Sequence, residues 1–299
     1  MGNCDLSIII VNWNAKDLLR DCLVSVFENV KINFEVIIVD NNSSDGSCEM
    51  IKKEFANKIN LKLIENKFNN GFASANNQAI LVSKGNCILL LNPDTLVHGG
   101  VIDETYRYLM NDKSIGVAGC KVLNPDGTLQ LACKRMAPNV KDAFYKLFGI
   151  SKIRKCEEKF SKYNLTYVSE DEFVDCDSVS GSYLMIKKEV IDKIGYLDET
   201  FFMYGEEMDW CMRAKKAGYI VRYCPVGDIT HFKGESSKKL GIKATYEFYR
   251  AMLIFYNKYN KSENIFFVNW MVYIGIYLLG FINICKNMVT KNKRVGSKG

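Results

Sequence analysis

Two carboxylates stand just after strongly apolar runs of the sequence. Asp40 follows the run EVIIV, and Asp94 lies in the segment NPDT that follows the run CILLL. A carboxylate at a strand end can accept hydrogen bonds from a nucleobase or a ribose hydroxyl. It can also bind Mg²⁺ or Mn²⁺ where a diphosphate completes the coordination. The structural alternatives are a helix N-cap around Asp40 and an Asx turn at Asp94.

A third acidic cluster holds Glu206, Glu207 and Asp209 at the expected start of a helix, among aromatic residues. Acids in the first turn of a helix complement its dipole, which is the structural explanation. Carboxyl groups that crowd together against aromatic rings also raise one another's pKa, which suits a general base. His231 follows an expected strand, and its role is either structural or the binding of a metal or phosphate.

These residues need a scaffold that brings strand ends together, and the first 100 residues predict one. The runs at 7–12, 35–39, 61–65 and 87–91 predict strands, and the segments 16–29, 47–57 and 71–83 predict helices between them. Strands that alternate with helices in this way form a parallel sheet with right-handed crossovers. Ligands bind at the carboxyl ends of such strands, where the polar clusters 12–14, 40–45 and 92–94 stand.

The pattern is looser after residue 100. The predicted elements are strands at 117–120, within 174–188 and at 219–223, and helices at 188–194, 201–218 and 245–259. His231 is expected in a loop after the last of these strands. The polar, lysine-rich segment 141–173 is expected to be a mobile segment or an insertion.

The basic charge of the chain is concentrated at its C-terminus. The net charge is +6, and residues 286–299 contain five Lys or Arg residues and no acid, so the other residues together carry +1. This charge excludes a basic nucleic-acid-binding protein. Basic residues beside an apolar segment point to a membrane surface instead. Two His residues are too few for a polyhistidine metal site.

The apolar segment at 265–285 has 21 residues without a charge. As a helix it would be roughly 31 Å long, which is enough to span a membrane. A single span would place the basic tail outside, against the positive-inside rule. A helix that lies in the interface, alone or paired with the helix at 245–259, keeps the tail beside anionic lipid. A buried core helix is the remaining alternative.

Eight segments together resemble the family 2 glycosyltransferases of the GT-A fold, most closely their rhamnosyltransferase-like branch. They are SIIIVNWN, VIIVDNNSSDGS, NNGFASANNQAI, LLLNPDT, NPDGTLQ, SGSYLMIKKEV, GYLDETFFMYGEEMDWCMRAKKAGY and THFKGES, in order from residue 7 to about residue 234. Each segment is weak alone, whereas eight in this order and spacing are specific. The resemblance implies an α/β, Rossmann-like nucleotide-diphospho-sugar transferase fold, and the apolar segment at 265–285 adds the predicted C-terminal membrane-associated helix.

The resemblance also implies roles for individual residues. On the nucleotide-sugar side it places Asn12, Asp40, Asn42, Asp45, Gly71, Asn77, Asn92 and Asp94. Asp94 and His231 would bind a divalent metal, Mn²⁺ or Mg²⁺. On the acceptor side it places Gln130, Arg135, Gly181, Trp210 and Arg213.

The acidic cluster would carry the catalytic residues. The resemblance makes Glu207 the general base, with Glu206 as the alternative. Many members have Asp at that position, so Glu207 lengthens the reach by one methylene. Asp209 is grouped with the catalytic residues, and with Arg213 it would hold the helix in place.

The predicted function is an inverting transfer of a sugar from dTDP-rhamnose or a UDP-sugar to a hydroxyl of a lipid-linked or polysaccharide glycan. The alternative is a non-catalytic, membrane-associated nucleotide-sugar-binding or scaffold protein with the same fold. A sugar-nucleotide pyrophosphorylase is disfavoured because NWNAKD stands where its Gly-rich phosphate loop should be. An NAD-binding protein is disfavoured because no GxGxxG follows the first strand.

The expected organisation has four parts. A catalytic domain at 1–235 precedes an amphipathic helical segment at 236–262, a hydrophobic membrane helix at 263–287 and a basic tail at 288–299. The expected location is the cytoplasmic face of the cell membrane, with membrane lipid as a partner and no nucleic acid.

Overall fold

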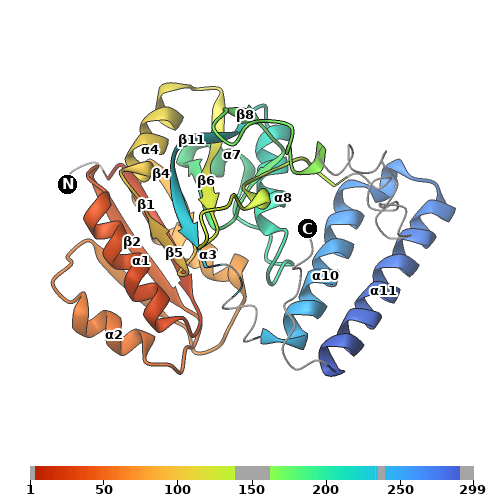
Figure 1. Ribbon diagram of the computed structural model, residues 1–299, viewed down its shortest axis with the longest axis horizontal. Coiled ribbons are helices and arrows are strands. Elements are labelled where there is room, and N and C mark those ends of the chain that lie inside the picture. The colour runs from red at the N-terminus through yellow and green to blue at the C-terminus, as the bar shows by residue number, and fades with distance from the viewer. Residues whose placement is uncertain (1–3, 139–161, 233, 235–239, 290–299) are drawn as a thin grey trace.

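The structure is a computed structural model that describes residues 4–138, 162–232, 234 and 240–289. Most of the expected insertion and most of the expected basic tail lie outside these residues. Figure 1 shows a sheet domain with helices on both faces and two long C-terminal helices beside it.

The first half of the chain forms the predicted parallel strands and helices. The strands are β1 (Leu6–Asn12), β2 (Phe34–Asp40), β3 (Leu61–Glu65) and β4 (Cys87–Leu91), and the helices are α1 (Lys16–Asn29), α2 (Ser47–Glu54) and α3 (Phe72–Val82). β1 pairs in parallel with both β2 and β4, and β2 pairs in parallel with β3. β1, most of β2 and β4 are buried, which explains why they read as continuous apolar runs.

The second half adds a mixed region that the sequence did not predict. Its strands are β5 (Thr95–Val97), β6 (Ile115–Leu123), β8 (Val174–Asp175), β10 (Tyr183–Lys187) and β11 (Ile220–His231). Among the described residues the sheet has the order β3-β2-β1-β4-β10-β6-β11-β5, with β8 on β11. β10 runs antiparallel to both β4 and β6. The apolar pattern of a buried strand carries no information about its direction, so the sequence did not predict that β10 is antiparallel. The parallel sheet predicted for the first 100 residues is confirmed.

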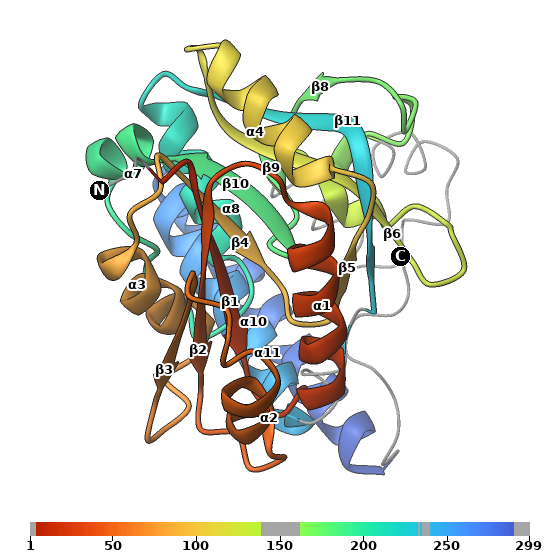
Figure 2. The same cartoon turned by 90° about the vertical axis from the view of Figure 1, so that its left-hand side faces the viewer.

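Two hydrophobic clusters cover the two faces of the sheet. Alternate residues of β1 divide between them: Ile8 and Ile10 belong to one cluster, and Ile9 to the other. The first cluster includes residues of α1 and α4 (Val101–Asn111), and the second those of α3, α7 (Lys188–Ile194) and α8 (Glu206–Lys216). Figure 2 shows these two groups of helices on opposite sides of the strands.

Two boundaries near the expected site differ from the prediction. Helix α8 begins at Glu206 instead of residue 201, because Tyr204 and Gly205 have φ values of 71° and 89°, which a right-handed helix excludes. His231 ends strand β11 instead of lying in a loop, since β11 continues past an irregularity between Tyr223 and Asp228 to pair with β5.

The segment around residue 130 also forms short elements. They are the 3₁₀ helix η1 (Leu131–Cys133) and β7 (Lys134–Arg135), which pairs with β9 (Ser178–Val179).

The C-terminal hairpin consists of α10 (Ile242–Tyr259), a 3₁₀ turn η3 (Lys261–Glu263) and α11 (Phe266–Val289). The two long helices lie side by side (Figure 1). Helix α10 packs on the sheet domain through an apolar cluster of Phe201, Met208, Ala251 and Phe255. By length and composition alone, Phe266–Met288 could cross a membrane.

Candidate active site

Asp94 and His231 meet at the end of the sheet where β4 and β11 finish. Their side chains are buried, with Asp94 Oδ1 3.2 Å from His231 Nε2. Asn92 Nδ2 is 3.3 Å from the same ring nitrogen. The pairing arises because β11 lies antiparallel to β5, which places His231 opposite Thr95, one residue after Asp94.

Gln130 fixes the orientation and tautomer of the imidazole. Its Nε2 donates to the carbonyl oxygens of His231 at 2.8 Å and Leu123 at 3.4 Å, which determines the orientation of the amide. Its Oε1 therefore accepts from His231 Nδ1, at 3.0 Å. Nδ1 then carries the proton, and a neutral ring presents its Nε2 lone pair to Asp94.

This pair has the geometry of two ligands of one cation. Adjacent ligands at about 2.1 Å from an octahedral ion are about 3 Å apart, close to the observed separation. A carboxylate oxygen and an imidazole nitrogen suit Mn²⁺, and Mg²⁺ prefers oxygen ligands. Within the residues that the structure describes, no group of three or more His, Cys, Asp or Glu side chains could hold a metal. A metal here would therefore take its remaining ligands from the substrate or from water.

Glu207 lies in the first turn of α8 with both carboxylate oxygens bonded. Oε1 accepts a hydrogen bond from Arg135 Nη2 at 2.8 Å, and Oε2 accepts one from the Gly205 amide at 3.1 Å. The exposed fractions of the two paired side chains are 15% for Arg135 and 12% for Glu207. A Cβ atom on Gly181 would lie 3.4 Å from Glu207 Cγ, so a glycine leaves room beside this carboxylate.

The neighbouring Glu206 has a different environment. It is buried, and among the described residues its Oε2 has no hydrogen-bond partner. Burial, together with the nearby charge of Glu207, raises the pKa of Glu206 well above its ordinary value. Glu206 is therefore protonated under conditions in which an exposed glutamate is ionised.

Two connections bring the Asp94 end and the Glu207 end together. The Asn92 amide donates to the Ser182 carbonyl at 3.1 Å, so Gly181 beside Glu207 adjoins the end of β4. The segment from Gln130 to Arg135 supplies the partner of His231 at one end and the partner of Glu207 at the other. The metal candidates and the base candidate thus line one edge of the sheet.

The ends of β1 and β2 form the third part of this edge. Asp40 is buried and accepts hydrogen bonds from Asn12 Nδ2 at 2.8 Å and from the Ser43 amide at 2.7 Å. Asn12 is fully buried, and no described residue bonds its Oδ1. These are acceptors at the position where the sequence predicted the nucleotide.

Asp45 and Asn42 have different surroundings. Asp45 accepts hydrogen bonds from the amides of Lys16 and Ser47, so it joins the starts of α1 and α2 as a structural cap. Asn42 is exposed and has a positive φ of 66°.

Gly71 joins the nucleotide end to the loop before α8. Its φ is 88°, and a Cβ atom would lie 2.6 Å from the Phe202 carbonyl oxygen. The Phe72 amide donates to that same oxygen at 2.7 Å, and Asn41 Nδ2 donates to the Gly71 carbonyl at 3.1 Å. Only glycine fits this contact.

Four of the predicted site residues have side chains engaged in internal contacts. Asn77 bonds Leu197 through both its amide oxygen and its amide nitrogen. Trp210 is fully buried and donates to the Gly195 carbonyl, so it does not line a cleft. Asp209 is fully buried and pairs with Arg213, and both stabilise the helix.

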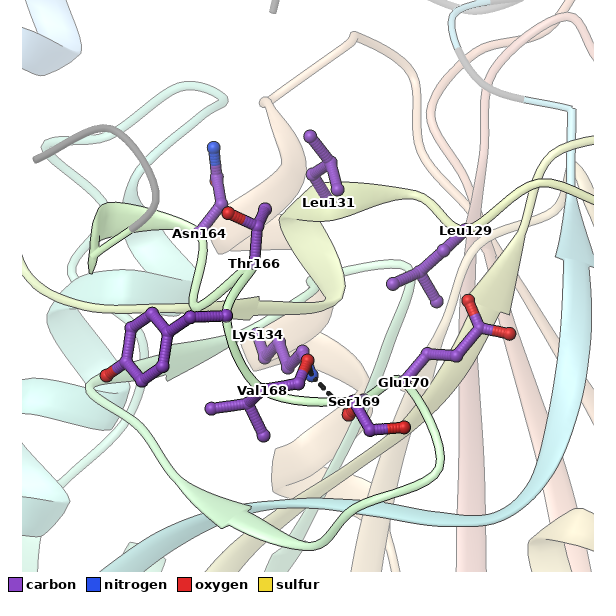
Figure 3. A pocket seen from close by; sticks show the side chains of 9 residues that line it. Leu129, Leu131, Lys134, Asn164, Thr166, Val168, Ser169 and Glu170 are labelled. Carbon is purple, nitrogen blue, oxygen red and sulfur yellow. Dashed lines mark hydrogen bonds between the residues drawn. The ribbon is translucent and has the colours of Figure 1, made fainter. Parts of the chain in front are cut away.

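A cavity of about 520 Å³ lies next to the segment 129–135 (Figure 3). It is lined by Leu129, Leu131, Lys134, Asn164, Thr166, Tyr167, Val168, Ser169 and Glu170. Lys134 Nζ donates to the carbonyls of Val168 and Ser169. Gln130 and Arg135, which contact His231 and Glu207, do not line this cavity. The cavity is therefore separate from the candidate active site.

Sequence reasoning missed four residues next to the site. Asn41 and Phe202 make the contacts of Gly71, and Lys258 and Tyr259 of α10 contact Asp209. Asn41 lies in the motif VIIVDNNSSDGS next to Asp40, so the sequence could have suggested it. No sequence pattern indicates that Lys258 and Tyr259 contact Asp209.

The comparison with known families decides the class of protein. The family model described as glycosyl transferase family 2 matches residues 7–195. The chain belongs to glycosyl transferase family 2. This glycosyltransferase is an enzyme, and the matched range contains the ends of β1, β2 and β4 but stops before α8 and His231.

Curated relatives carry similar activities in their names. The low-salt glycan biosynthesis hexosyltransferase Agl10 of Haloferax volcanii is 27% identical over 266 residues, which are 88% of this chain and 76% of that protein. The N-acetylglucosaminyl-diphospho-decaprenol L-rhamnosyltransferase of Mycobacterium tuberculosis is 23% identical over 243 residues, 78% of this chain and 77% of that protein.

Solved structures show the GT-A fold. The mannosyltransferase PcManGT of Pyrobaculum calidifontis, in complex with GDP-Man and Mn²⁺, has a TM-score of 0.57 at 16% identity, covering 84% of this chain and 64% of that one. Residues 1–349 of S. aureus TarS in complex with UDP give a TM-score of 0.54 at 17% identity, covering 81% and 65%. This glycosyltransferase spans slightly less than two thirds of these two chains.

The raised pKa of Glu206 predicts a pH-dependent stability. An unfolded glutamate ionises near pH ~4.3, whereas folded Glu206 keeps its proton to higher pH. Above that pH the free energy of unfolding therefore falls, by at most about 1.4 kcal/mol per pH unit, until the folded-state pKa is reached. Glu206→Gln, which is neutral in both states, should gain melting temperature relative to the wild type between pH 5 and pH 8.

The control is Glu104→Gln on α4, whose parent side chain is 53% exposed. It should follow the wild-type curve. If the difference in melting temperature between Glu206→Gln and wild type is the same at every pH in this range, Glu206 is not a buried, protonated carboxyl group.

Proposed function

We propose that this enzyme transfers a sugar, with inversion, from a nucleotide-sugar to a hydroxyl of a lipid-linked or polysaccharide glycan, and that it depends on a divalent metal. The observation that carries the proposal is the buried pair of Asp94 and His231, aligned by Gln130, on the same sheet edge as Glu207. The reaction needs a cation site beside the leaving diphosphate and a base beside the attacking hydroxyl, on opposite sides of the anomeric carbon.

Glu207 is the proposed general base. It would accept the proton of the acceptor hydroxyl while that oxygen bonds the anomeric carbon and the bond from carbon to the diphosphate oxygen breaks. Its two oxygens are oriented by Arg135 and the Gly205 amide, which hold the carboxylate in a fixed position. Glu206 is buried, and burial raises its pKa well above its ordinary value, whereas Glu207 is partly exposed, so Glu207 is the preferred candidate.

Asp94 and His231 Nε2 would hold Mn²⁺ or Mg²⁺, and the neighbouring Asn92 amide would face the same site. A bound metal would supply positive charge against the charge that develops on the departing nucleoside diphosphate. Asp40 and Asn12 would accept hydrogen bonds from the base or the ribose.

The names of the relatives support the substrate class. The relative in M. tuberculosis is named for a rhamnosyl transfer to a sugar-diphospho-lipid, and a poly(ribitol-phosphate) β-glucosyltransferase of Bacillus spizizenii is 29% identical over 139 residues. A dTDP-rhamnose or UDP-sugar donor fits this group. A panel of nucleotide-sugars with Mn²⁺ and purified protein identifies the donor.

With that donor, Glu207→Gln should lower kcat by about 10²- to 10⁴-fold, because the amide keeps the shape of the side chain but accepts no proton. Donor binding should persist, as the strand ends that bind the nucleotide are unchanged. Steady-state kinetics and a donor titration measure the two effects. Glu206→Gln and Asp209→Asn are the comparison variants. Near-wild-type kcat in Glu207→Gln, with loss in one of these two, would show that the base is assigned to the wrong residue.

The membrane is the proposed location of the reaction, through an apolar stripe on α11. The stripe consists of exposed Phe266, Phe267, Trp270, Ile274, Tyr277, Leu278, Phe281 and Met288. These side chains carry no charge, and Lys286 and the basic tail lie at the C-terminal end of the stripe. Aromatic and basic residues around an apolar stripe favour the interface of an anionic bilayer.

The polar residues of α11 support a helix that lies in the interface instead of spanning the bilayer. Tyr256 donates to Asn269, and Asn283 Nδ2 donates to Tyr249 at 2.6 Å. Asn287 Nδ2 donates to Thr245 at 2.6 Å. These bonds tie α11 to α10 along its length, and α10 carries charged residues that a span would bring into hydrocarbon. The cytoplasmic face would then be the site of reaction, since nucleotide-sugars are cytosolic.

Binding to vesicles tests this proposal. The full chain should sediment with vesicles that contain anionic lipid. Replacing Trp270 and Phe281 together by Ser should reduce binding at least about tenfold, because each CH₂ group that is no longer buried in the bilayer removes about 0.8 kcal/mol of binding free energy. Phe68→Ser is the matched control, since Phe68 is 73% exposed but lies far along the chain, in the loop after β3. Equal binding of the stripe variant and the wild type would contradict the proposal. Protease cleavage of the tail on the outer side of sealed vesicles distinguishes a helix in the interface from a span.

A further inference from the structure

Helix α8, which carries Glu207, is held from outside the sheet domain by the last turn of α10. Asp209 lies two residues after Glu207 and is fully buried. Lys258 Nζ is 2.6 Å from Asp209 Oδ1, and Tyr259 OH donates to the same oxygen at 2.6 Å. A buried carboxylate requires such partners, because its charge has lost its water.

Further bonds extend this contact to the loop before α8. Arg213 Nε donates to Asp209 Oδ2 at 2.8 Å, and its guanidinium donates to the carbonyls of Ile194 and Tyr196. Lys258 Nζ also donates to Asp198 Oδ2, at 2.7 Å. We call Asp209, Arg213, Lys258 and Tyr259 the α8 clamp.

The surroundings of Lys258 favour its charged form. Although burial opposes the change, the Lys258 ammonium and the hydrogen bonds from Thr200 lower the pKa of Asp198 to about 2. The same lysine has a raised pKa, despite its own burial, because it bonds Asp198 and Asp209. One lysine of α10 thus stays charged between two carboxylates of the sheet domain.

An apolar contact lies next to the clamp. Phe201 and Met208 of the sheet domain pack against Ala251 and Phe255 of α10, and the Phe255 and Tyr259 rings are 4.7 Å apart between centroids. Phe201 lies at the start of the loop that turns into α8 at Gly205. Helix α10 therefore contacts both the entry to α8 and its first turn.

We propose that Lys258 and Tyr259 are positioning residues for Glu207, so that the hairpin is part of the catalytic apparatus as well as a membrane anchor. This rests on the proposed role of Glu207 as the base. A general base must lie within hydrogen-bond reach of its proton, and a displacement of about 1 Å can cost about 10²-fold in rate. Lys258 and Tyr259 hold α8 at Asp209, two residues from Glu207, whereas the nucleotide end at β1, β2 and β4 lies outside the clamp.

The test separates positioning from mere stabilisation by comparing kcat with the KM of the donor. Tyr259→Phe removes one hydroxyl, and Lys258→Met removes one charge from the clamp. Each should lower kcat of the folded enzyme by about 10- to 10²-fold with the donor KM within about twofold of wild type. Lys258→Arg keeps a cation at the same place and should restore most of the rate.

Arg250→Met is the matched control on the same helix, because Arg250 pairs with Glu247 of α10 and not with α8. It should keep the wild-type kcat. Where Lys258→Met fails to fold, Tyr259→Phe gives the answer, since it keeps the ring packed on Phe255.

A wild-type kcat in Tyr259→Phe, with or without a lower melting temperature, would overturn the proposal and leave the clamp a structural contact. A fall of kcat accompanied by an equal loss of donor binding would overturn it as well. Glu207→Gln is measured in parallel. An inactive Glu207→Gln beside fully active clamp variants refutes the positioning role alone, whereas an active Glu207→Gln refutes the base assignment.

Discussion

The site depends on the buried contact between His231 Nε2, which presents a lone pair, and the carboxylate of Asp94. Gln130 is held by two strand carbonyls and in turn holds the Nδ1 proton of His231, so the ring cannot turn its Nε2 away from Asp94. Two acceptors 3.2 Å apart repel each other unless a proton or a metal cation lies between them. The proposed metal ion, bound where β11 pairs with β5, would remove this repulsion and would supply the positive charge that a diphosphate leaving group needs.

The antiparallel strand β10 connects this cation site to the base. Because β10 enters between β4 and β6 from the site edge, the turn before it passes Glu207 at Gly181. The next residue, Ser182, accepts a hydrogen bond from the Asn92 amide at the end of β4. A parallel strand at the same place would start at the opposite edge. In the proposed function, the parallel half of the sheet would contact the nucleotide and the mixed half would contact the acceptor.

The sequence predicted the elements at 16–29, 61–65, 87–91 and 188–194 with the observed bounds, because local apolar patterns determine such elements. It did not predict the direction of β10 or the late start of α8, which depend on neighbouring strands and on the left-handed Tyr204 and Gly205. The site residues at strand ends were recognisable by type. Their partners were not, since Gln130 and His231 are 101 residues apart and Arg135 and Glu207 are 72 apart, so that only the tertiary structure joins them.

Titration of Mn²⁺ in the presence of a nucleoside diphosphate, followed by calorimetry, tests the central claim most directly. The account predicts that wild-type protein binds Mn²⁺ together with the diphosphate, that Asp94→Ala abolishes this binding, and that Gln130→Ala weakens it about 10- to 10²-fold by releasing the imidazole. Thermal stability of Asp94→Ala should change little, because a strand-end carboxylate contributes little to core packing. Equal Mn²⁺ affinity in Asp94→Ala and wild type, or full turnover in EDTA, would contradict the account.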